Sequence, residues 1–94
     1  MPTLRIEHSV PDFEGWKLAF EHDPIGRERS GVRRYQIARP IDDPNYVMID
    51  LEFDTAAEAE VLLAAMRRVW TGAGAAVSSN QRARIVETVE AKAY

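Results

Sequence analysis

Cysteine is missing from this 94-residue chain. Its absence excludes a disulfide framework and every zinc or iron–sulfur site that is built on thiolates, and it is compatible with a reducing compartment. Long apolar runs are missing too, because no segment approaches the ~20 apolar residues that span a bilayer. The first nine residues alternate in polarity and lack the continuous apolar core of a signal peptide. We therefore expect a cytoplasmic protein with no membrane partner.

A strong excess of positive charge is also lacking, since the formal net charge is −3. Nucleic-acid binding depends on neutralising phosphates, so we expect no nucleic acid as a partner. Four arginines do gather in one connection, where Glu28 interrupts them: Arg27, Arg29, Arg33 and Arg34. This cluster is either a solvated turn, which we favour, or an anion site.

The remaining composition, 46% apolar and 29% charged, is ordinary for a globular protein, and the length predicts one domain over residues 1–94. The clearest element is a strand over residues 45–53. The apolar residues Val47, Ile49, Leu51 and Phe53 alternate there with Tyr46, Met48, Asp50 and Glu52. This period of two residues is the pattern of a strand with one buried face. We treat this strand as the centre of the fold.

Before this strand, the pattern predicts a strand over residues 3–10, a helix capped by Asp12, and a second strand over residues 32–39. The first strand would carry Leu4, Ile6 and His8 on one face, and the helix would turn Phe13, Trp16 and Phe20 to the core. Tyr35 and Ile37 of the second strand would face the helices. Between the helix and the second strand, Asp23-Pro24 predicts a short helical turn that ends at Gly31. Residues 40–44 predict the turn of a hairpin.

After the central strand, Asp54 or Thr55 would cap a second long helix, and Thr55 and Glu58 have capping-box spacing. Its apolar stripe is Ala59, Leu62, Leu63, Met66 and Trp70, and it would end near Gly72. Residues 72–81 predict a loop. Residues 82–90 predict a last strand with Ile85 and Val89 in the core.

The order strand, helix, strand, strand, helix, strand predicts an α+β, ferredoxin-like fold: a four-stranded antiparallel sheet with two helices on one face and strands 1 and 3 at the centre. The other sheet face would carry Arg5, Glu7, Arg34, Gln36, Met48, Asp50, Glu52 and Thr88. Physical arguments alone slightly favour a solvated face. The alternative is contact with a second subunit, with Arg5 or Arg34 paired to Asp50, Glu7 or Glu52.

Several short motifs over the first two-thirds of the chain resemble a family of small actinobacterial proteins in the dimeric α/β-barrel superfamily, related to antibiotic-biosynthesis-type monooxygenases and polyketide cyclases. The matching residues are His8-Ser9-Val10-Pro11-Asp12-Phe13, Trp16-Lys17, Phe20, Gly31-Val32, Arg39, Asp43-Pro44-Asn45 and Glu52-Phe53-Asp54. The resemblance implies a homodimer whose two sheets face each other. It also implies a ligand cavity between the helices and the sheet of each subunit, and it favours the dimer over the solvated face.

Candidate chemistry centres on His8, which ends the first strand next to the aromatic helix and could act as an acid or base on a phenolic or enolic substrate. A half-buried histidine whose hydrogen bonds are satisfied is the more common role. Trp16, Phe20, Tyr35 and Trp70 are candidate walls of a pocket for a flat ligand, although helix-face aromatics are more often plain core. His8 and His22 lack ligand spacing and a third partner, so we expect no metal.

Two functions stay open at this stage. The first is a small homodimer that binds an aromatic or polyketide-like metabolite and oxidises or cyclises it without a cofactor. The second is a non-enzymatic ligand sensor or dimerisation module in which the aromatics are only core. Because a fold does not determine a function, the sequence does not choose between them.

Overall fold

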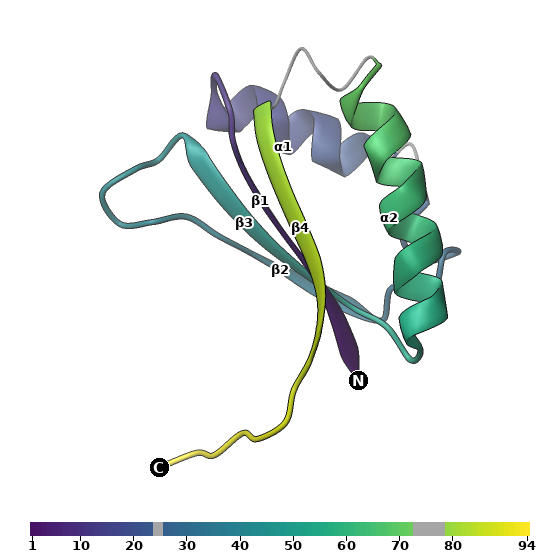
Figure 1. The fold of residues 1–94 in the computed structure, drawn as a ribbon. Helices are drawn as coiled ribbons and strands as arrows, with labels where there is room; N and C mark the ends of the chain where they lie inside the picture. The colour runs from purple at the N-terminus through teal and green to yellow at the C-terminus, as the bar shows by residue number, and fades with distance from the viewer. Residues whose placement is uncertain (24–25, 73–78) are drawn as a thin grey trace.

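The computed structural model describes residues 1–23, 26–72 and 79–94. Its elements are β1 (Pro2–Ser9), α1 (Phe13–His22), β2 (Arg34–Ala38), β3 (Tyr46–Glu52), α2 (Ala56–Trp70) and β4 (Ser79–Glu87). The strands form one antiparallel sheet in the order β2-β3-β1-β4, and both helices lie on the same side of it (Figure 1). This is the predicted ferredoxin-like fold, with β1 and β3 at the centre.

The alternating pattern of β1 and β3 determines which sheet face is buried. The two strands pair so that Leu4 lies opposite Leu51, Ile6 opposite Ile49 and His8 opposite Val47. All six side chains are at most 2% exposed, because they lie between the sheet and the helices. The apolar stripes of α1 and α2 complete this core with Trp16, Phe20, Ala59, Leu62 and Leu63. We call the opposite sheet face, which no helix covers, the open face.

Aspartates cap both ends of helix α1, Asp12 at its start and Asp23 at its end. The Gly15 N–H donates to the Asp12 carboxylate at 2.9 Å, as the predicted N-cap requires. Asp23 closes the helix with φ 50° and then accepts the N–H of Arg27 on its carboxylate at 2.9 Å. A single hydrogen-bonded turn follows and ends at Gly31, whose φ of 103° needs a glycine. Pro24, the other half of the predicted turn signal, lies outside the described residues.

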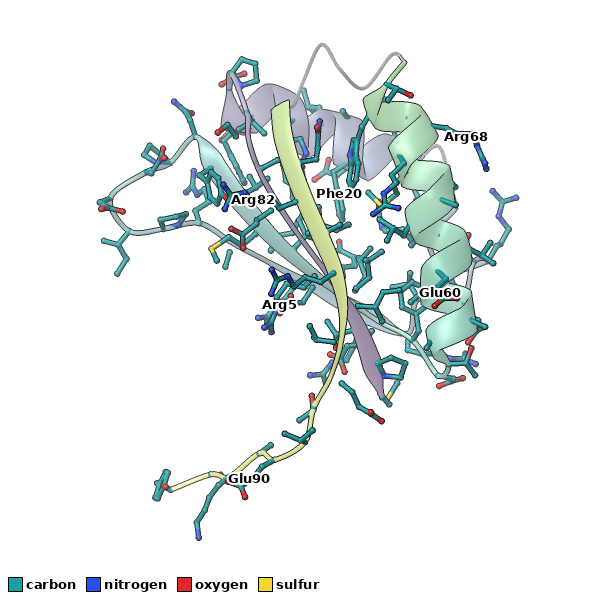
Figure 2. The ribbon with its side chains drawn as sticks, in the orientation of Figure 1. Arg5, Phe20, Glu60, Arg68, Arg82 and Glu90 are labelled. Carbon is teal, nitrogen blue, oxygen red and sulfur yellow. The ribbon has the colours of Figure 1, made fainter. Side chains whose placement is uncertain are left out.

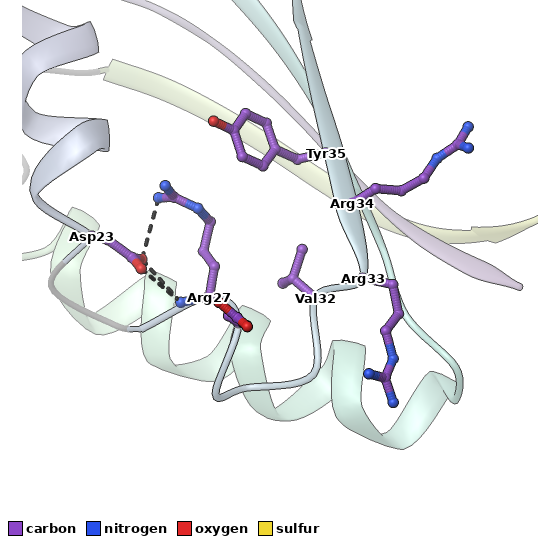
Figure 3. A pocket seen from close by; sticks show the side chains of 7 residues that line it. Asp23, Arg27, Val32, Arg33, Arg34 and Tyr35 are labelled. Atoms are coloured by element: carbon purple, nitrogen blue, oxygen red, sulfur yellow. Dashed lines mark hydrogen bonds and ion pairs between the residues drawn. The ribbon is translucent and has the colours of Figure 1, made fainter.

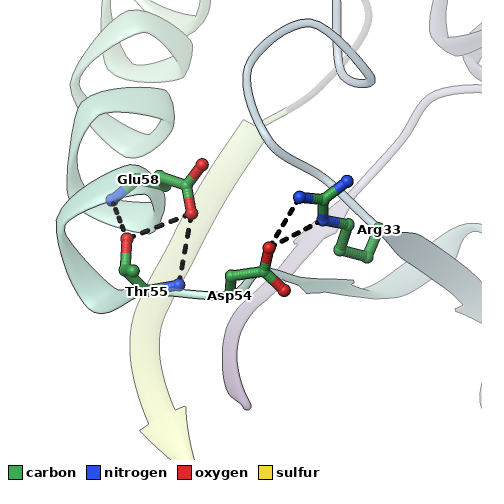
Figure 4. Close-up of polar contacts among 4 residues, drawn as sticks. All are labelled: Arg33, Asp54, Thr55 and Glu58. Carbon is green, nitrogen blue, oxygen red and sulfur yellow. Dashed lines mark hydrogen bonds and ion pairs between the residues drawn. The ribbon is translucent and has the colours of Figure 1, made fainter.

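Helix α2 begins with the predicted capping box (Figure 4). The Thr55 hydroxyl accepts the Glu58 N–H at 3.2 Å, and the Glu58 carboxylate accepts the Thr55 N–H at the same distance. Of the two candidate caps, Thr55 is therefore the cap. Asp54 instead accepts hydrogen bonds from the Arg33 guanidinium, which tie the start of the helix to the chain that leads into β2.

The prediction for the end of the chain was wrong in two respects. The loop expected over residues 72–81 ends earlier, because β4 already begins at Ser79; residues 73–78 lie outside the described part of the chain. Val89 is not in the core but 94% exposed, since β4 ends at Glu87. Glu87 pairs with Pro2, so β1 has no further residues for Val89 to pack beside. Ala83 and Ile85 are the β4 residues that pack on the core.

Candidate functional site

His8 is the most deeply buried ionisable side chain at the core. Its place in the alternation of β1 turns it toward the helices, and it is only 1% exposed. Two tryptophan rings meet it edge-on, Trp16 of α1 at 5.9 Å and Trp70 of α2 at 6.4 Å between ring centroids. The expected contact with Trp16 is thus present, and Trp70 joins it from the other helix.

The protonation of His8 follows from these surroundings. Burial lowers its pKa, because the charged imidazolium loses its hydration; the backbone carbonyl of Ser9 opposes this effect in part. The ring Nδ1 lies 3.3 Å from that carbonyl oxygen. A carbonyl only accepts hydrogen bonds, so this contact places the proton on Nδ1 and leaves Nε2 as the basic nitrogen. His8 is therefore neutral near pH 7 and able to take up a proton.

The predicted ligand residues form one continuous series of ring contacts with His8. Trp16 and Phe20, four residues apart on α1, lie 5.2 Å apart, and Phe20 meets Tyr35 of β2 edge-on at 5.1 Å. Tyr35 is 48% exposed, so the series leads from the core to the surface. We call this series the aromatic row: Trp70, His8, Trp16, Phe20 and Tyr35. The structure brings together every site residue that the sequence singled out.

Arg27 lies at the outer end of the aromatic row, and the sequence did not indicate this role. Its guanidinium carbon is 3.7 Å from the centre of the Phe20 ring and 5.2 Å from that of Tyr35, a cation–π arrangement. The same guanidinium donates to the Phe20 carbonyl oxygen at 2.8 Å and pairs with Asp23 at 3.3 Å. A basic residue in a turn carries no sequence signal for such stacking, because the contact joins separate elements.

A cavity of about 460 Å³ opens beside Tyr35 (Figure 3). Its lining consists of Asp23, Arg27, Glu28, Val32, Arg33, Arg34 and Tyr35. Each arginine of this lining has a carboxylate partner: Arg27 pairs with Asp23, Arg33 with Asp54 and Arg34 with Glu52. The charges of these three arginines are already compensated, which argues against an anion site in this cavity. Arg29, the fourth arginine of the predicted cluster, is not part of the lining.

The open face carries the ion pairs that the sequence allowed. Arg5 of β1 pairs with Asp50 of β3 at 2.9 Å, and Arg34 of β2 pairs with Glu52. The Tyr46 hydroxyl donates to Glu7 at 2.6 Å, a bond that raises the pKa of the tyrosine. The charges that β1, β2 and β3 present on this face are therefore paired at Arg5–Asp50 and Arg34–Glu52.

Two features of the open face differ from the prediction. Thr88 is not part of it, because it lies beyond the end of β4. Arg82 and Arg84 belong to it instead, since they lie opposite Glu7 and Arg5 in the β1–β4 register. Both arginines lie inside the predicted strand over residues 82–90 and alternate in step with Thr88, so the pattern already allowed them on this face.

No group of three potential metal ligands exists among the described residues. None of the helices described is both long enough and apolar enough to cross a lipid bilayer.

Comparison with known proteins places this geometry among solved structures. No protein-family model matches the chain, and no curated protein matches it. A candidate antibiotic biosynthesis monooxygenase from Deinococcus radiodurans is 13% identical with a TM-score of 0.76, covering 100% of this chain and 98% of the other. A dimeric ferredoxin-like protein from an uncultured marine organism is 7% identical with a TM-score of 0.71, covering 100% of both chains.

A mutant of MhuD, solved with two manganese protoporphyrin IX molecules per active site, is 14% identical with a TM-score of 0.65 and also covers 100% of both chains. The chain shares the fold of these proteins. Its structural neighbours are ferredoxin-like proteins of the antibiotic biosynthesis monooxygenase type. At these identities the likeness establishes the fold, and the function has to be argued from the residues themselves.

Proposed function

We propose that this protein is a small cytoplasmic homodimer that binds a flat aromatic or polyketide-like metabolite and oxidises or cyclises it without a cofactor. The observation that carries the proposal is the aromatic row, which connects the buried base His8 to the cavity beside Tyr35. Tyr35 lines the cavity, and the other rings of the row would form aromatic walls for a flat ligand that separates them on its way to His8. The monooxygenase names among the structural neighbours agree with this choice.

In the proposed chemistry His8 is the general base. Nε2 takes a proton from a phenol or from a carbon next to a carbonyl, and the apolar surroundings keep the imidazole neutral until then. The resulting electron-rich carbon attacks a carbonyl of the same molecule in a cyclisation. In an oxidation, molecular oxygen is the oxidant: a CH₂ becomes a carbonyl with one oxygen atom, and the other oxygen leaves as water with both hydrogens.

Access to His8 depends on Arg27, because its guanidinium covers the Phe20 ring at the outer end of the aromatic row. A ligand that enters from the cavity first meets Tyr35 and then has to displace Arg27 from Phe20. The side chains of Arg27 and Asp23 are 18% and 32% exposed. Displacement of Arg27 therefore breaks a partly buried ion pair, the hydrogen bond to the Phe20 carbonyl and the contact with the Phe20 ring.

The homodimer is supported by Met48 on the open face, which is 38% exposed on β3. The ion pairs of that face lie within one chain and leave it free of unpaired charge on β2 and β3 near Met48. One structural neighbour is itself described as dimeric. In the proposed dimer the open faces of the two copies lie against each other.

Intrinsic fluorescence tests the binding site directly, since both tryptophans of the chain belong to the aromatic row. Titration with a hydroxyanthrone is expected to quench their emission with saturation. Tyr35→Ala is expected to weaken binding about tenfold, and Val61→Ala, on the exposed outer side of α2, serves as the matched control.

The conversion of the anthrone to the quinone is measured by oxygen uptake and by the mass of the product. His8→Gln should bind the anthrone but fail to convert it. Absence of saturable quenching would contradict the proposal.

The alternative function, a non-enzymatic sensor or dimerisation module, is favoured by one observation. His8 is 1% exposed and does not line the cavity, so in this conformation no substrate touches it. The same titration separates the two functions. Quenching without any His8-dependent turnover, over a panel of anthrones and other phenols, would support the sensor function and exclude the enzymatic one.

A further inference from the structure

The last seven residues of the chain, 88–94, form a segment that the rest of the molecule does not hold. We call it the C-terminal segment. All of its residues are exposed, and Val89 and Tyr94 are 94% and 111% exposed. It leaves the sheet at the end of β4 and runs away from both helices (Figure 1). Its ring contact is internal, between Lys92 and Tyr94 at 5.7 Å. Burial of such exposed apolar side chains against another surface is favourable, because it removes them from water.

The open face carries a charge that the described chain does not neutralise. Arg84 of β4 lies directly opposite Arg5 of β1, and like charges in cross-strand positions repel each other. Arg5 is paired with Asp50, whereas Arg84 has no ion pair among the residues that the structure describes. Arg5 and Arg82 point to the side of the sheet away from α2, as Figure 2 shows. An anionic group from outside the chain would relieve this repulsion.

The C-terminal segment contains such a group in Glu90, which also has no ion pair within the described ranges. Arg84 and Glu90 of one copy do not pair in this structure, because the chain leaves the sheet after Glu87 and runs away from it (Figure 1). The Glu90 carboxylate and the Arg84 guanidinium, unpaired within the described ranges, are therefore complementary between two copies.

We propose that the C-terminal segment is an arm that lies on the open face of a second copy, with the Glu90 carboxylate paired to Arg84 of that copy. Val89 and Tyr94 are then buried against the second copy beside Met48, which is itself 38% exposed on that face. Two-fold symmetry makes the exchange reciprocal, so each copy gives one arm and receives one. This inference rests on the proposed homodimer and adds the segment that holds it together.

The test uses the full-length chain and measures the dimer dissociation constant by sedimentation velocity over a concentration series. Val89→Ser with Tyr94→Ser is expected to raise the constant at least tenfold. Arg84→Glu alone and Glu90→Arg alone are each expected to raise it about tenfold, and the combined charge swap to restore it to within threefold of the wild type. Arg68→Glu, on the outer side of α2 (Figure 2), is the control and should change nothing.

The outcomes separate the arm from the dimer. A wild-type dimer that the Val89 and Tyr94 substitutions do not weaken overturns the arm and leaves the proposed dimer in place. Weakening by both single charge changes without rescue in the combination overturns the Arg84–Glu90 pairing. A wild-type protein that is monomeric at 100 micromolar overturns the arm together with the proposed dimer. Circular dichroism of each variant confirms that the fold is intact.

Discussion

At the scale of single residues, His8 has the most unusual surroundings in the described chain. A histidine at the end of a strand usually reaches water, but this one is enclosed by Trp16 and Trp70 from the two helices. The enclosure keeps the ring neutral and couples its protonation to folding. The burial of His8 therefore contributes to how the free energy of unfolding changes with pH.

We predict that the free energy of unfolding falls as the pH drops below about 6.5, the ordinary pKa of histidine. In the unfolded chain His8 then takes up a proton, whereas in the folded chain its lowered pKa keeps it neutral. Proton uptake therefore stabilises the unfolded state relative to the folded one. The slope reaches at most about 1.4 kcal/mol per pH unit for one proton. Urea unfolding between pH 7.5 and 5.5 measures it.

His8→Gln should remove most of that slope, since its side chain does not titrate. His22→Gln, on the exposed end of α1, is the matched control for the loss of a histidine and should retain the slope. Equal slopes in the wild type and His8→Gln would mean that His8 is not enclosed in solution as it is in this structure.

At the scale of elements, the start of α2 depends on a contact with the turn before β2. A methyl group on Gly31 would collide with the Glu58 carboxylate, the same group that completes the capping box with Thr55. The positive φ of Gly31 adds backbone strain for any other residue. Gly31, Thr55 and Glu58 therefore act as one unit, although 27 residues separate Gly31 from Glu58.

We predict that Thr55→Ala costs about 1 kcal/mol of unfolding free energy through loss of the cap. Gly31→Ala should cost about 1–3 kcal/mol, because it strains the backbone and displaces Glu58. The double variant should cost at least about 0.5 kcal/mol less than the two costs together, since both changes disrupt the same contact. Urea unfolding of the four proteins measures the coupling. Strict additivity would mean that Glu58 moves aside freely and that the two sites are independent.

At the scale of the whole molecule, the helices cover one sheet face and nothing in the described chain covers the other. Met48 lies on that open face among the paired charges, and Val61 lies on the outside of α2; they are 38% and 71% exposed. In an isolated monomer both side chains contact water. In the proposed dimer only Met48 becomes buried.

We therefore predict that Met48→Glu raises the dimer dissociation constant about 100-fold or more, because it places an unpaired charge in the interface. Val61→Glu is the matched control and should leave the constant unchanged. Analytical ultracentrifugation of the two variants beside the wild type decides the question. The same weakening by both variants would locate the interface elsewhere.

The pattern of the sequence was sufficient for most of the fold. Alternation in residues 45–53 and 3–10 identified the buried face of β3 and β1, and helical spacing identified Trp16, Phe20 and Trp70 as inward-facing. These features are local, because a period of two or 3.6 residues is determined by the backbone of a single element. Gly31 was identified from its place at the end of the short turn, whereas the choice of Thr55 over Asp54 as the cap came from the structure.

Other features depended on which elements lie side by side. Val89 continues the alternation of β4, yet it is exposed because β1 has ended beside it. The stacking of Arg27 on Phe20 and the opposition of Arg84 and Arg5 join elements that no local pattern connects. The sequence by itself determined the elements and their buried faces. Only the tertiary structure decided where pairing stops and which charges meet, because strand register and packing depend on contacts between residues distant in the chain.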